Sequence, residues 1–308
     1  MKNPSKPGRR RLLQAVGGIA ASTMVTRSFA EAKVLATRPI PSSAEQLPVV
    51  GLGTYQSFGV GADVAEREPL QQVLRLFVEH GGKLVDSSPM YGSSEAVLGD
   101  LAAATGVANR LFMATKVWTS GREAGIRQME ESFVRMKVTR MDLMQIHNLL
   151  DWKTHLPTLK QWKQAGRIRY TGITHYHSGA YSELERLMKM REFDFVQFNY
   201  SIVEREAEER ILPLARETGT AVIVNRPFAQ ASLFSRVRGK QVPEWAAEFE
   251  CTSWGQFFLK YILAHPAVTC AIPATAKPEH LLDNMMAGVG KLPDESTRKK
   301  MALYIDNL

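Results

Sequence analysis

The sequence predicts a single (β/α)8 barrel of the α/β class, the fold also called a TIM barrel. Eight short apolar, strand-like runs alternate with amphipathic, helix-like stretches along the chain. Near-continuous apolar strands are typical of a parallel sheet that is covered on both faces. Eight strand-helix units close into a barrel of about 250 residues. The chain of 308 residues, 44% hydrophobic and 23% charged, supplies enough apolar material for one such core.

The predicted strands are 48–54, 83–88, 111–117, 141–147, 168–174, 193–200, 220–226 and 268–273. The predicted helices are 65–80, 93–104, 122–137, 154–165, 178–191, 205–218, 252–264 and 278–287. In the first helix, Leu70, Val73 and Phe77 share one face, and Gly81-Gly82 favours a stop. The run 204–210 predicts an exposed helix start. The long stretch 230–250 is expected to form an ordered loop beside the site.

Residues 1–30 are predicted to be an export signal, and residues 31–308 the barrel domain. The signal segment holds six basic and no acidic residues. Arg9-Arg10-Arg11 precedes a mild apolar stretch, 12–25, and a small-residue cleavage site near Ala30. Paired arginines favour the twin-arginine export machinery as a partner, and hence a periplasmic or other extracytoplasmic location. The alternatives are an uncleaved signal that anchors the protein in a membrane and a basic tail on a cytoplasmic protein.

Charge and cysteine content narrow the possible functions. The formal net charge is +8, but residues 1–30 contribute +6, so the remaining chain carries only +2. This balance indicates no nucleic-acid partner. The two cysteines, Cys251 and Cys270, are expected to be small core residues. No His or Cys spacing predicts a metal site.

Four residues with proton chemistry lie at or just after three of the predicted strands: Asp86, Tyr91, Lys116 and His147. A parallel barrel gathers such residues at its C-terminal face. A tyrosine hydroxyl with a pKa of about 10 is a poor acid, and an adjacent Lys116 ammonium is expected to lower that pKa. Asp86 would keep the lysine protonated, while His147 would align a carbonyl. The four residues together predict proton donation to a carbonyl oxygen.

The segments around these residues resemble the aldo-keto reductase family along nearly all of 31–308. The strongest similarity is V-D-S-S-P-M-Y-G-S-S-E-A-V-L-G (85–99), joined by A-T-K-V (114–117) and M-D-L-M-Q-I-H-N-L-L-D-W (141–152). The resemblance implies an enzyme, an NAD(P)H-dependent oxidoreductase that reduces aldehydes or ketones to alcohols. It implies Tyr91 as the general acid and His147 as the residue that orients the carbonyl.

The resemblance also implies a nicotinamide dinucleotide cofactor, NADPH with NADH as the alternative, bound without a Rossmann motif. The implied cofactor-binding residues are Gly53, Thr54, Thr174, His175, Gln197, Asn225, Arg226, Pro227, Lys277, Glu279, His280 and Asn284. Thr174, His175 and Gln197 are the implied contacts of the carboxamide. The family commonly has Ser-Asn in place of Thr174-His175, and a stacking aromatic residue near Asn225. Arg226 is expected either to replace that aromatic residue by stacking its planar guanidinium on the nicotinamide ring or to pair with a phosphate.

For the adenosine end, the run 272–284 resembles the start of the eighth barrel helix, whose N-terminus favours an anion. Lys277 is the expected partner of the 2′-phosphate, and Asn284 of the adenine. Many relatives carry an arginine where His280 stands, so the sequence leaves open the choice between NADPH and NADH. Tyr55, Trp118 and Trp152 are expected to line the substrate mouth.

Two other function classes fit parts of the sequence. The changed pair Thr174-His175 and the missing aromatic residue at Asn225 are compatible with an exported cofactor-binding redox sensor or subunit with little turnover. A metal-dependent barrel hydrolase would use Asp86 and His147, but no second histidine lies at ligand spacing. The patterns fix neither the physiological carbonyl nor the oligomeric state.

Overall fold

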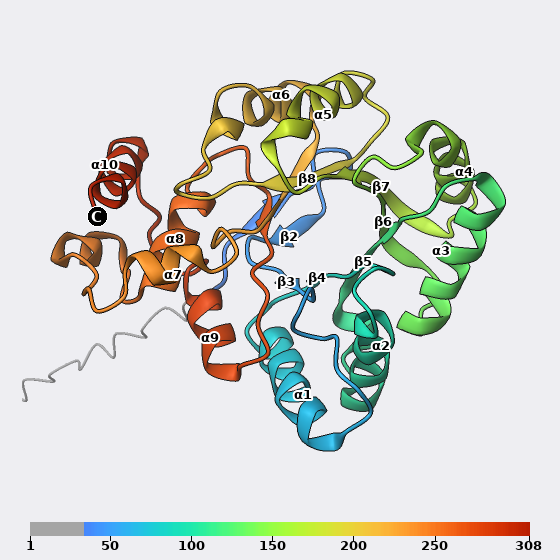
Figure 1. The fold of residues 1–308 in the computed structure, drawn as a ribbon, viewed down its shortest axis with the longest axis horizontal. Coiled ribbons are helices and arrows are strands. Elements are labelled where there is room, and N and C mark those ends of the chain that lie inside the picture. Colours follow the sequence, from blue (N-terminus) through green and yellow to red (C-terminus); the bar gives the residue numbers. More distant parts are fainter. Residues whose placement is uncertain (1–33) are drawn as a thin grey trace, which may run out of the picture. The chain divides into compact units, whose positions relative to one another are not determined.

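A computed structural model describes residues 34–308, which fold around one closed sheet (Figure 1). Eight parallel strands follow one another in chain order. They are β3 (Leu52–Gly53), β4 (Leu84–Asp86), β5 (Phe112–Val117), β6 (Met141–His147), β7 (Ile168–Thr174), β8 (Phe195–Asn199), β9 (Ala221–Asn225) and β10 (Cys270–Ala271). Parallel bridges Val50–Ala271 and Gly53–Ala274 join the first strand to the last. The predicted barrel is confirmed.

A ring of helices surrounds the sheet in Figure 1. Its members are α1 (Val64–Glu79), α2 (Ser94–Thr105), α3 (Arg122–Met136), α4 (Trp152–Gln164), α5 (Tyr181–Met188), α6 (Ile211–Thr218), α8 (Trp254–Leu263) and α9 (Pro278–Met286). Each corresponds to a predicted helix. The start of α6 is later than predicted because residues Glu206–Glu208 form a short 3-10 turn. In the part of the chain that the structure describes, no helix has the length and apolar character needed to cross a membrane.

Local chemistry explains the bounds of α1. Asp63 caps its first turn by accepting a hydrogen bond from the backbone N–H of Ala65. The face predicted from Leu70, Val73 and Phe77 is buried in the core. After the helix, a side chain at Gly82 would collide with the Phe77 ring, since a Cβ there would lie 2.2 Å from it. Glycine is therefore required where the chain turns back into β4.

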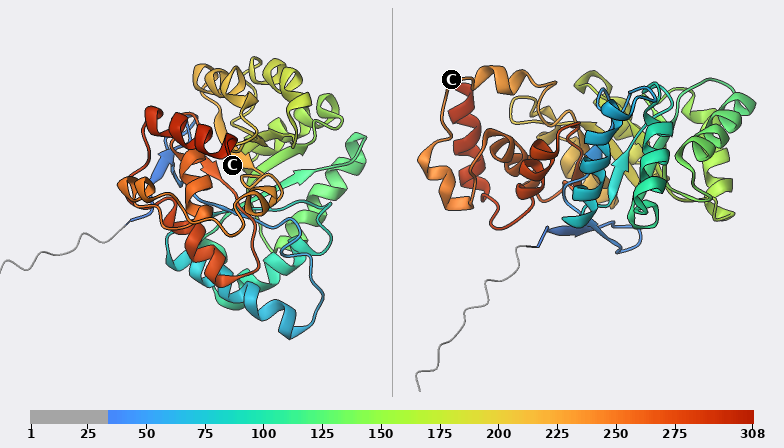
Figure 2. Two further views of the ribbon diagram at one scale, coloured as in Figure 1. Left: turned by 60° about the vertical axis from the view of Figure 1, so that its left-hand side comes forward. Right: turned by 90° about the horizontal axis from the view of Figure 1, so that it is seen from below.

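Two strands and two α-helices were not predicted: β1 (Thr37–Pro39), β2 (Gln46–Pro48), α7 (Ser232–Arg236) and α10 (Glu295–Asp306). Strands β1 and β2 pair as an antiparallel hairpin, which lies against one end of the barrel (Figure 2). Ile40 and Leu47 of this hairpin are fully buried among the side chains of the barrel lumen. The hairpin therefore closes that end of the barrel. Helix α7 lies within the stretch 230–250 that was expected to be an ordered loop.

The barrel lumen is apolar at the hairpin end and polar at the other. Alternate strand residues point inward, so each strand contributes residues spaced by two. The inner cluster comprises Ile40, Leu47, Leu84, Phe112, Ala114, Leu143, Tyr170, Phe195, Ala221, Ile223, Cys270 and Ile272. Two residues beyond Leu84, Ala114 and Leu143, the inward positions hold polar side chains instead. A second, larger cluster fills the space between the strands and the helices. Cys251 and Cys270 are both buried and free, as expected.

Helix α10 is fastened to the barrel through Glu208. Oε1 of Glu208 accepts hydrogen bonds from the hydroxyls of Tyr200 at 2.5 Å and Tyr261 at 2.6 Å. Nη2 of Arg298, on α10, donates to the same oxygen at 2.7 Å. Burial acts to raise the pKa of Glu208, but these donors hold it below its ordinary value. The expectation that 204–210 is simply an exposed helix start is therefore wrong for Glu208.

Candidate active site

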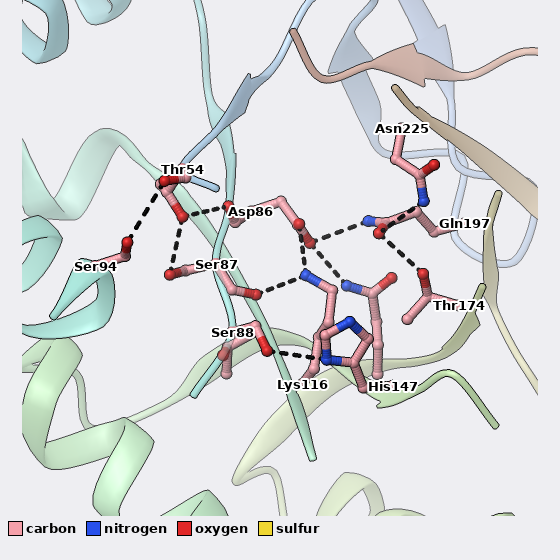
Figure 3. Close-up of polar contacts among 12 residues, drawn as sticks. Thr54, Asp86, Ser87, Ser88, Ser94, Lys116, His147, Thr174, Gln197 and Asn225 are labelled. Carbon is pink, nitrogen blue, oxygen red and sulfur yellow. Dashed lines mark hydrogen bonds and ion pairs between the residues drawn. The ribbon is translucent and has the colours of Figure 1, made fainter. Parts of the chain in front are cut away.

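A polar layer occupies the lumen where the strands end (Figure 3). Asp86 ends β4, Lys116 lies near the end of β5, and Gln145 and His147 lie at the end of β6. These positions face inward because each lies an even number of residues from an apolar lumen residue on its own strand. The structure thus brings together residues that are far apart in the sequence, as the parallel barrel predicts.

Lys116 and Asp86 form a buried ion pair. Nζ of Lys116 lies 2.6 Å from Oδ2 of Asp86 and donates a second hydrogen bond to the carbonyl oxygen of Ser87 at 2.7 Å. The Lys116 side chain is completely buried, and only 3% of the Asp86 side chain is exposed. Burial acts to lower the pKa of Lys116, but Asp86 and Tyr91 outweigh it and raise that pKa. Lys116 is therefore a cation at neutral pH.

The other carboxylate oxygen of Asp86 is held by two amides. Nε2 of Gln145 donates to Oδ1 at 2.9 Å, and Nε2 of Gln197 donates to the same atom at 3.1 Å. Both glutamine side chains are buried. Hydrogen bonds to an ionised carboxylate are stronger than those between neutral groups. Asp86 therefore accepts hydrogen bonds at both carboxylate oxygens, from Lys116 at Oδ2 and from the two amides at Oδ1.

Tyr91 follows β4 and lies above the ion pair. Nζ of Lys116 is 5.0 Å from the centroid of the Tyr91 ring. Burial raises the pKa of Tyr91, and the nearby Lys116 charge lowers it by less. The expected net lowering of this pKa is therefore wrong in the structure, because burial outweighs the ammonium ion. The consequence is a phenol that stays protonated at neutral pH and so retains the proton it would donate.

His147 is held as a neutral imidazole. Its ring is almost fully buried, and burial followed by the charge of Lys116 lowers its pKa to about 2. Nδ1 of His147 lies 3.0 Å from the hydroxyl of Ser88, which accepts from the backbone N–H of Met90 at 3.3 Å. If the Ser88 hydroxyl donates to Nδ1, Nε2 carries the proton. That tautomer can donate a hydrogen bond to a carbonyl oxygen.

Gly53 and Thr54 make internal contacts in this structure. A Cβ at Gly53 would lie 2.8 Å from the carbonyl oxygen of Ile272, so glycine permits the first and last strands to approach. The backbone N–H of Thr54 donates to the carbonyl oxygen of Asp86 at 3.1 Å, and its hydroxyl donates to the same oxygen at 3.0 Å. Thr54 thus braces the chain that carries Asp86.

The residues expected to hold a carboxamide are linked to one another. The hydroxyl of Thr174 donates to Oε1 of Gln197 at 3.0 Å, and Nδ2 of Asn225 donates to the carbonyl oxygen of His175 at 3.0 Å. The amide group of Gln197 is therefore shared between Thr174 and Asp86. Oδ1 of Asn225 is buried and has no hydrogen-bond partner among residues 34–308. An unpaired buried acceptor of this kind suits a ligand N–H group.

Arg226 connects the loops that follow β7 and β9. Its Nη1 donates to the carbonyl oxygen of Tyr176 at 2.9 Å, and its guanidinium lies 6.0 Å from the centroid of the Tyr176 ring. Nε of Arg226 is buried without a partner in the described part of the chain. His175 stacks beside Tyr176, and burial followed by His177 lowers the pKa of His175 to about 4. Pro227 follows as a buried residue.

The residues expected at the adenosine end gather at the start of α9. Lys277 is the residue that precedes the helix, and its backbone N–H donates to the hydroxyl of Thr275 at 3.0 Å. Lys277, Glu279 and His280 are exposed, whereas Asn284 is buried. An exposed helix N-terminus with a lysine beside it suits a phosphate.

Two of the three residues expected at the substrate mouth lie beside Tyr91 and His147. The Tyr55 ring is 5.0 Å from the Tyr91 ring, and the Trp118 ring is 6.2 Å from the His147 ring. Trp152 instead begins α4 and lies against Arg186 of α5, whose guanidinium is 5.1 Å from the indole centroid. The structure therefore places Tyr55 and Trp118 at the site, and Trp152 between two helices.

Gln145 and Ser88 are residues of the polar layer that were not predicted from the sequence. Gln145 lies two residues before His147 on the same strand, so the period of two would have placed both in the lumen. Ser88 lies between Asp86 and Tyr91 in the segment of strongest family similarity. In residues 34–308, no group of three or more His, Cys, Asp or Glu side chains is arranged to hold a metal ion.

The sequence matches the model of one protein family and the sequences of known proteins. The family model described as "Aldo/keto reductase family" matches residues 49–304. Methylglyoxal reductase YeaE of Escherichia coli is 28% identical over 245 residues, which cover 77% of this chain and 84% of that protein.

Solved structures also match the fold. An aldo/keto reductase from Klebsiella pneumoniae in complex with NADP and acetate gives a TM-score of 0.72 at 23% identity, covering 85% of this chain and 93% of that one. The glycerol dehydrogenase AKR11B4 of Gluconobacter oxydans gives 0.70 at 22% identity, covering 87% and 94%. These likenesses support the barrel fold.

Proposed function

The chain belongs to the aldo/keto reductase family, and on this basis we propose how its residues reduce a carbonyl compound. The protein is an oxidoreductase that reduces aldehydes or ketones to alcohols. The observation that carries the assignment of roles is the convergence of Asp86, Tyr91, Lys116 and His147 in one polar layer, with Lys116 2.6 Å from Asp86 and 5.0 Å from the Tyr91 ring.

The proposed cofactor is NADPH, with NADH as the alternative. Unpaired buried atoms on Asn225 and Arg226, and the exposed Lys277 at the start of α9, fit a ligand with amide and phosphate groups. The Klebsiella pneumoniae structure is described as a complex with NADP. When bound, a nicotinamide dinucleotide supplies the hydride that the carbonyl carbon accepts.

The residues of this chain provide the proton and the alignment. Tyr91 donates its phenolic proton to the carbonyl oxygen, which completes the alcohol. The Lys116 ammonium stabilises the phenolate that remains, and Asp86 holds that ammonium in place. His147, as the neutral tautomer set by Ser88, donates a hydrogen bond from Nε2 to the carbonyl oxygen. Tyr55 and Trp118 provide apolar surface for a small substrate.

Methylglyoxal is the first substrate to test, because a relative that covers most of the chain is described as a methylglyoxal reductase. The experiment measures NADPH oxidation by residues 31–308 with methylglyoxal and a panel of other small aldehydes and ketones. Removing the acid in Tyr91→Phe should lower kcat roughly 100-fold to 10,000-fold, while NADPH still binds. Tyr304→Phe makes the same change on α10 and should keep wild-type turnover.

If the protein binds NADPH but turns over none of the carbonyl compounds, the result would favour the alternative function, a cofactor-binding redox sensor. If Tyr91→Phe keeps full activity, Tyr91 is not the general acid. The convergence of the four catalytic residues supports the enzyme over the sensor.

We also propose that the protein is exported by the twin-arginine machinery and acts in the periplasm. The support is the sequence of residues 1–30, which lie outside the described residues: three consecutive arginines, an apolar stretch and a small-residue site. Replacing Arg9, Arg10 and Arg11 with lysine should leave the full-length protein in the cytoplasm. If cell fractionation finds as much of this variant outside the cytoplasm as of the wild type, the proposed export route is wrong.

A further inference from the structure

Gln145 lies at the centre of the polar layer, although neither the sequence motifs nor the proposed chemistry assigns it a role. It is fully buried on β6, and its Nε2 donates to Oδ1 of Asp86 at 2.9 Å. An ionised carboxylate only accepts hydrogen bonds, so the amide must turn its NH2 group toward Asp86. The direction of the Gln145 amide is fixed by this contact.

The other end of the amide has no partner. Oε1 of Gln145 is buried and accepts no hydrogen bond from the residues that the structure describes. A buried acceptor without a donor destabilises a fold. The hydrogen bond to the Asp86 carboxylate must therefore offset the cost of this unpaired acceptor. Among residues 34–308, that bond is the one hydrogen bond that the Gln145 side chain makes.

The neighbouring strand leaves room for this side chain. A Cβ at Gly172 on β7 would lie 3.0 Å from Cγ of Gln145 and 3.2 Å from the carbonyl oxygen of Phe195. Either distance is shorter than an ordinary contact, so a larger residue would displace Gln145 or the strand. Gly172 thus allows Gln145 to extend across the lumen to a strand that is not its neighbour.

We propose that Gln145 is a positioning residue for carbonyl reduction, whose amide holds Asp86 in the orientation that keeps Lys116 beside Tyr91. The inference rests on the proposed function and adds one residue to it. Gln145 acts through Asp86. Gln197 donates to the same carboxylate oxygen at 3.1 Å, so amides from two other strands fix Asp86 while Lys116 takes its second oxygen.

The test compares Gln145→Met and Gln145→Glu with the wild type by NADPH oxidation with methylglyoxal from about pH 5 to pH 9. Gln145→Met removes the donor and keeps the length. Its kcat/KM should fall roughly tenfold, the effect of losing one hydrogen bond to a charged group, while the KM for NADPH stays within about twofold.

Gln145→Glu provides a reversible version of the same change. At high pH the new carboxylate repels Asp86, so kcat/KM should fall below that of Gln145→Met. At low pH the carboxyl group is protonated and donates a hydrogen bond to Asp86 in place of the amide. Activity relative to the wild type should therefore recover as the pH falls. A purely structural role for Gln145 predicts no such recovery.

Thr158→Val is the matched control. The hydroxyl of Thr158 on α4 is also buried and makes no hydrogen bond to Asp86 or to any other described residue. The control should change the unfolding midpoint and leave the pH profile of kcat/KM as in the wild type. Wild-type turnover in Gln145→Met, or no recovery of Gln145→Glu at low pH, would overturn the inference.

A second measurement does not depend on turnover. If the wild type reduces no carbonyl, the proposed function fails, and a double-mutant cycle of Gln145→Met with Asp86→Asn in urea unfolding still tests the contact. Non-additive midpoints are the expected result. Strictly additive midpoints would show that Gln145 does not hold Asp86.

Discussion

Lys116 is expected to matter for stability as much as for chemistry. Its Nζ satisfies both Oδ2 of Asp86 at 2.6 Å and the carbonyl oxygen of Ser87 at 2.7 Å. Lys116→Met keeps a linear side chain of similar volume but removes the positive charge. The Asp86 carboxylate then stays buried with only the amides of Gln145 and Gln197 as donors.

The size of the effect follows from this geometry. Removing one partner of a buried ion pair costs about 3–5 kcal/mol, mostly because the remaining charge is buried and uncompensated. Two amide donors stay on Asp86, so we expect the low end, about 3 kcal/mol. For a chain of this size, each kcal/mol of lost stability lowers the thermal unfolding midpoint by about 2–4 °C. The expected fall is therefore about 6–12 °C.

The assay is urea unfolding followed by circular dichroism at neutral pH, with thermal unfolding beside it. The matched variant is Lys116→Met combined with Asp86→Asn, which removes the stranded charge and should recover most of the lost stability. Two results would refute the reasoning: a loss below about 1 kcal/mol in Lys116→Met, or a double variant no more stable than the single one. Either would mean that the pair is not the buried charge pair described above.

Two further predictions concern His147 and Glu208. The pKa of His147 is about 2 in the fold against an ordinary 6.5, so the unfolded chain binds the extra proton as the pH falls below 6.5, and stability falls with it. His147→Gln should flatten this fall in urea unfolding measured between about pH 7 and pH 4; equal slopes would contradict it. Glu208→Gln should cost about 1–3 kcal/mol in thermal unfolding because Arg298 loses its carboxylate. Glu209→Gln, at an exposed neighbour, should change stability by less than about 0.5 kcal/mol, and similar losses in both would argue against the Glu208 network.

The barrel was predictable because each of its eight strands is a short apolar run followed by a helical pattern. Helix α10 was not, because its buried face consists of Arg298, Met301 and Ile305. The first residue of that face is charged, which leaves only two apolar positions to show the helical period, and its partner Glu208 lies 90 residues away. The hairpin strands β1 and β2 have three residues each, too few to show an alternating pattern.

The site was predictable in its residue types and less so in its electrostatics. The family segments identify Asp86, Tyr91, Lys116 and His147, and the barrel brings them together. The net effect on the pKa of Tyr91 depends on burial, which sequence spacing does not reveal. The link from Gln145 to Asp86 joins strands 59 residues apart. Such a contact exists only once the barrel has closed.

The β1–β2 hairpin closes one end of the barrel lumen, so the lumen can open only at the end where the strand-end loops lie. With Ile40 and Leu47 filling one end, the Asp86 and Lys116 pair lies toward the other end of the lumen, beneath the rim formed by the strand-end loops. Any molecule bound at that rim therefore covers the polar layer beneath it. Its arrival lowers the local dielectric around the pair and strengthens the attraction between the two charges.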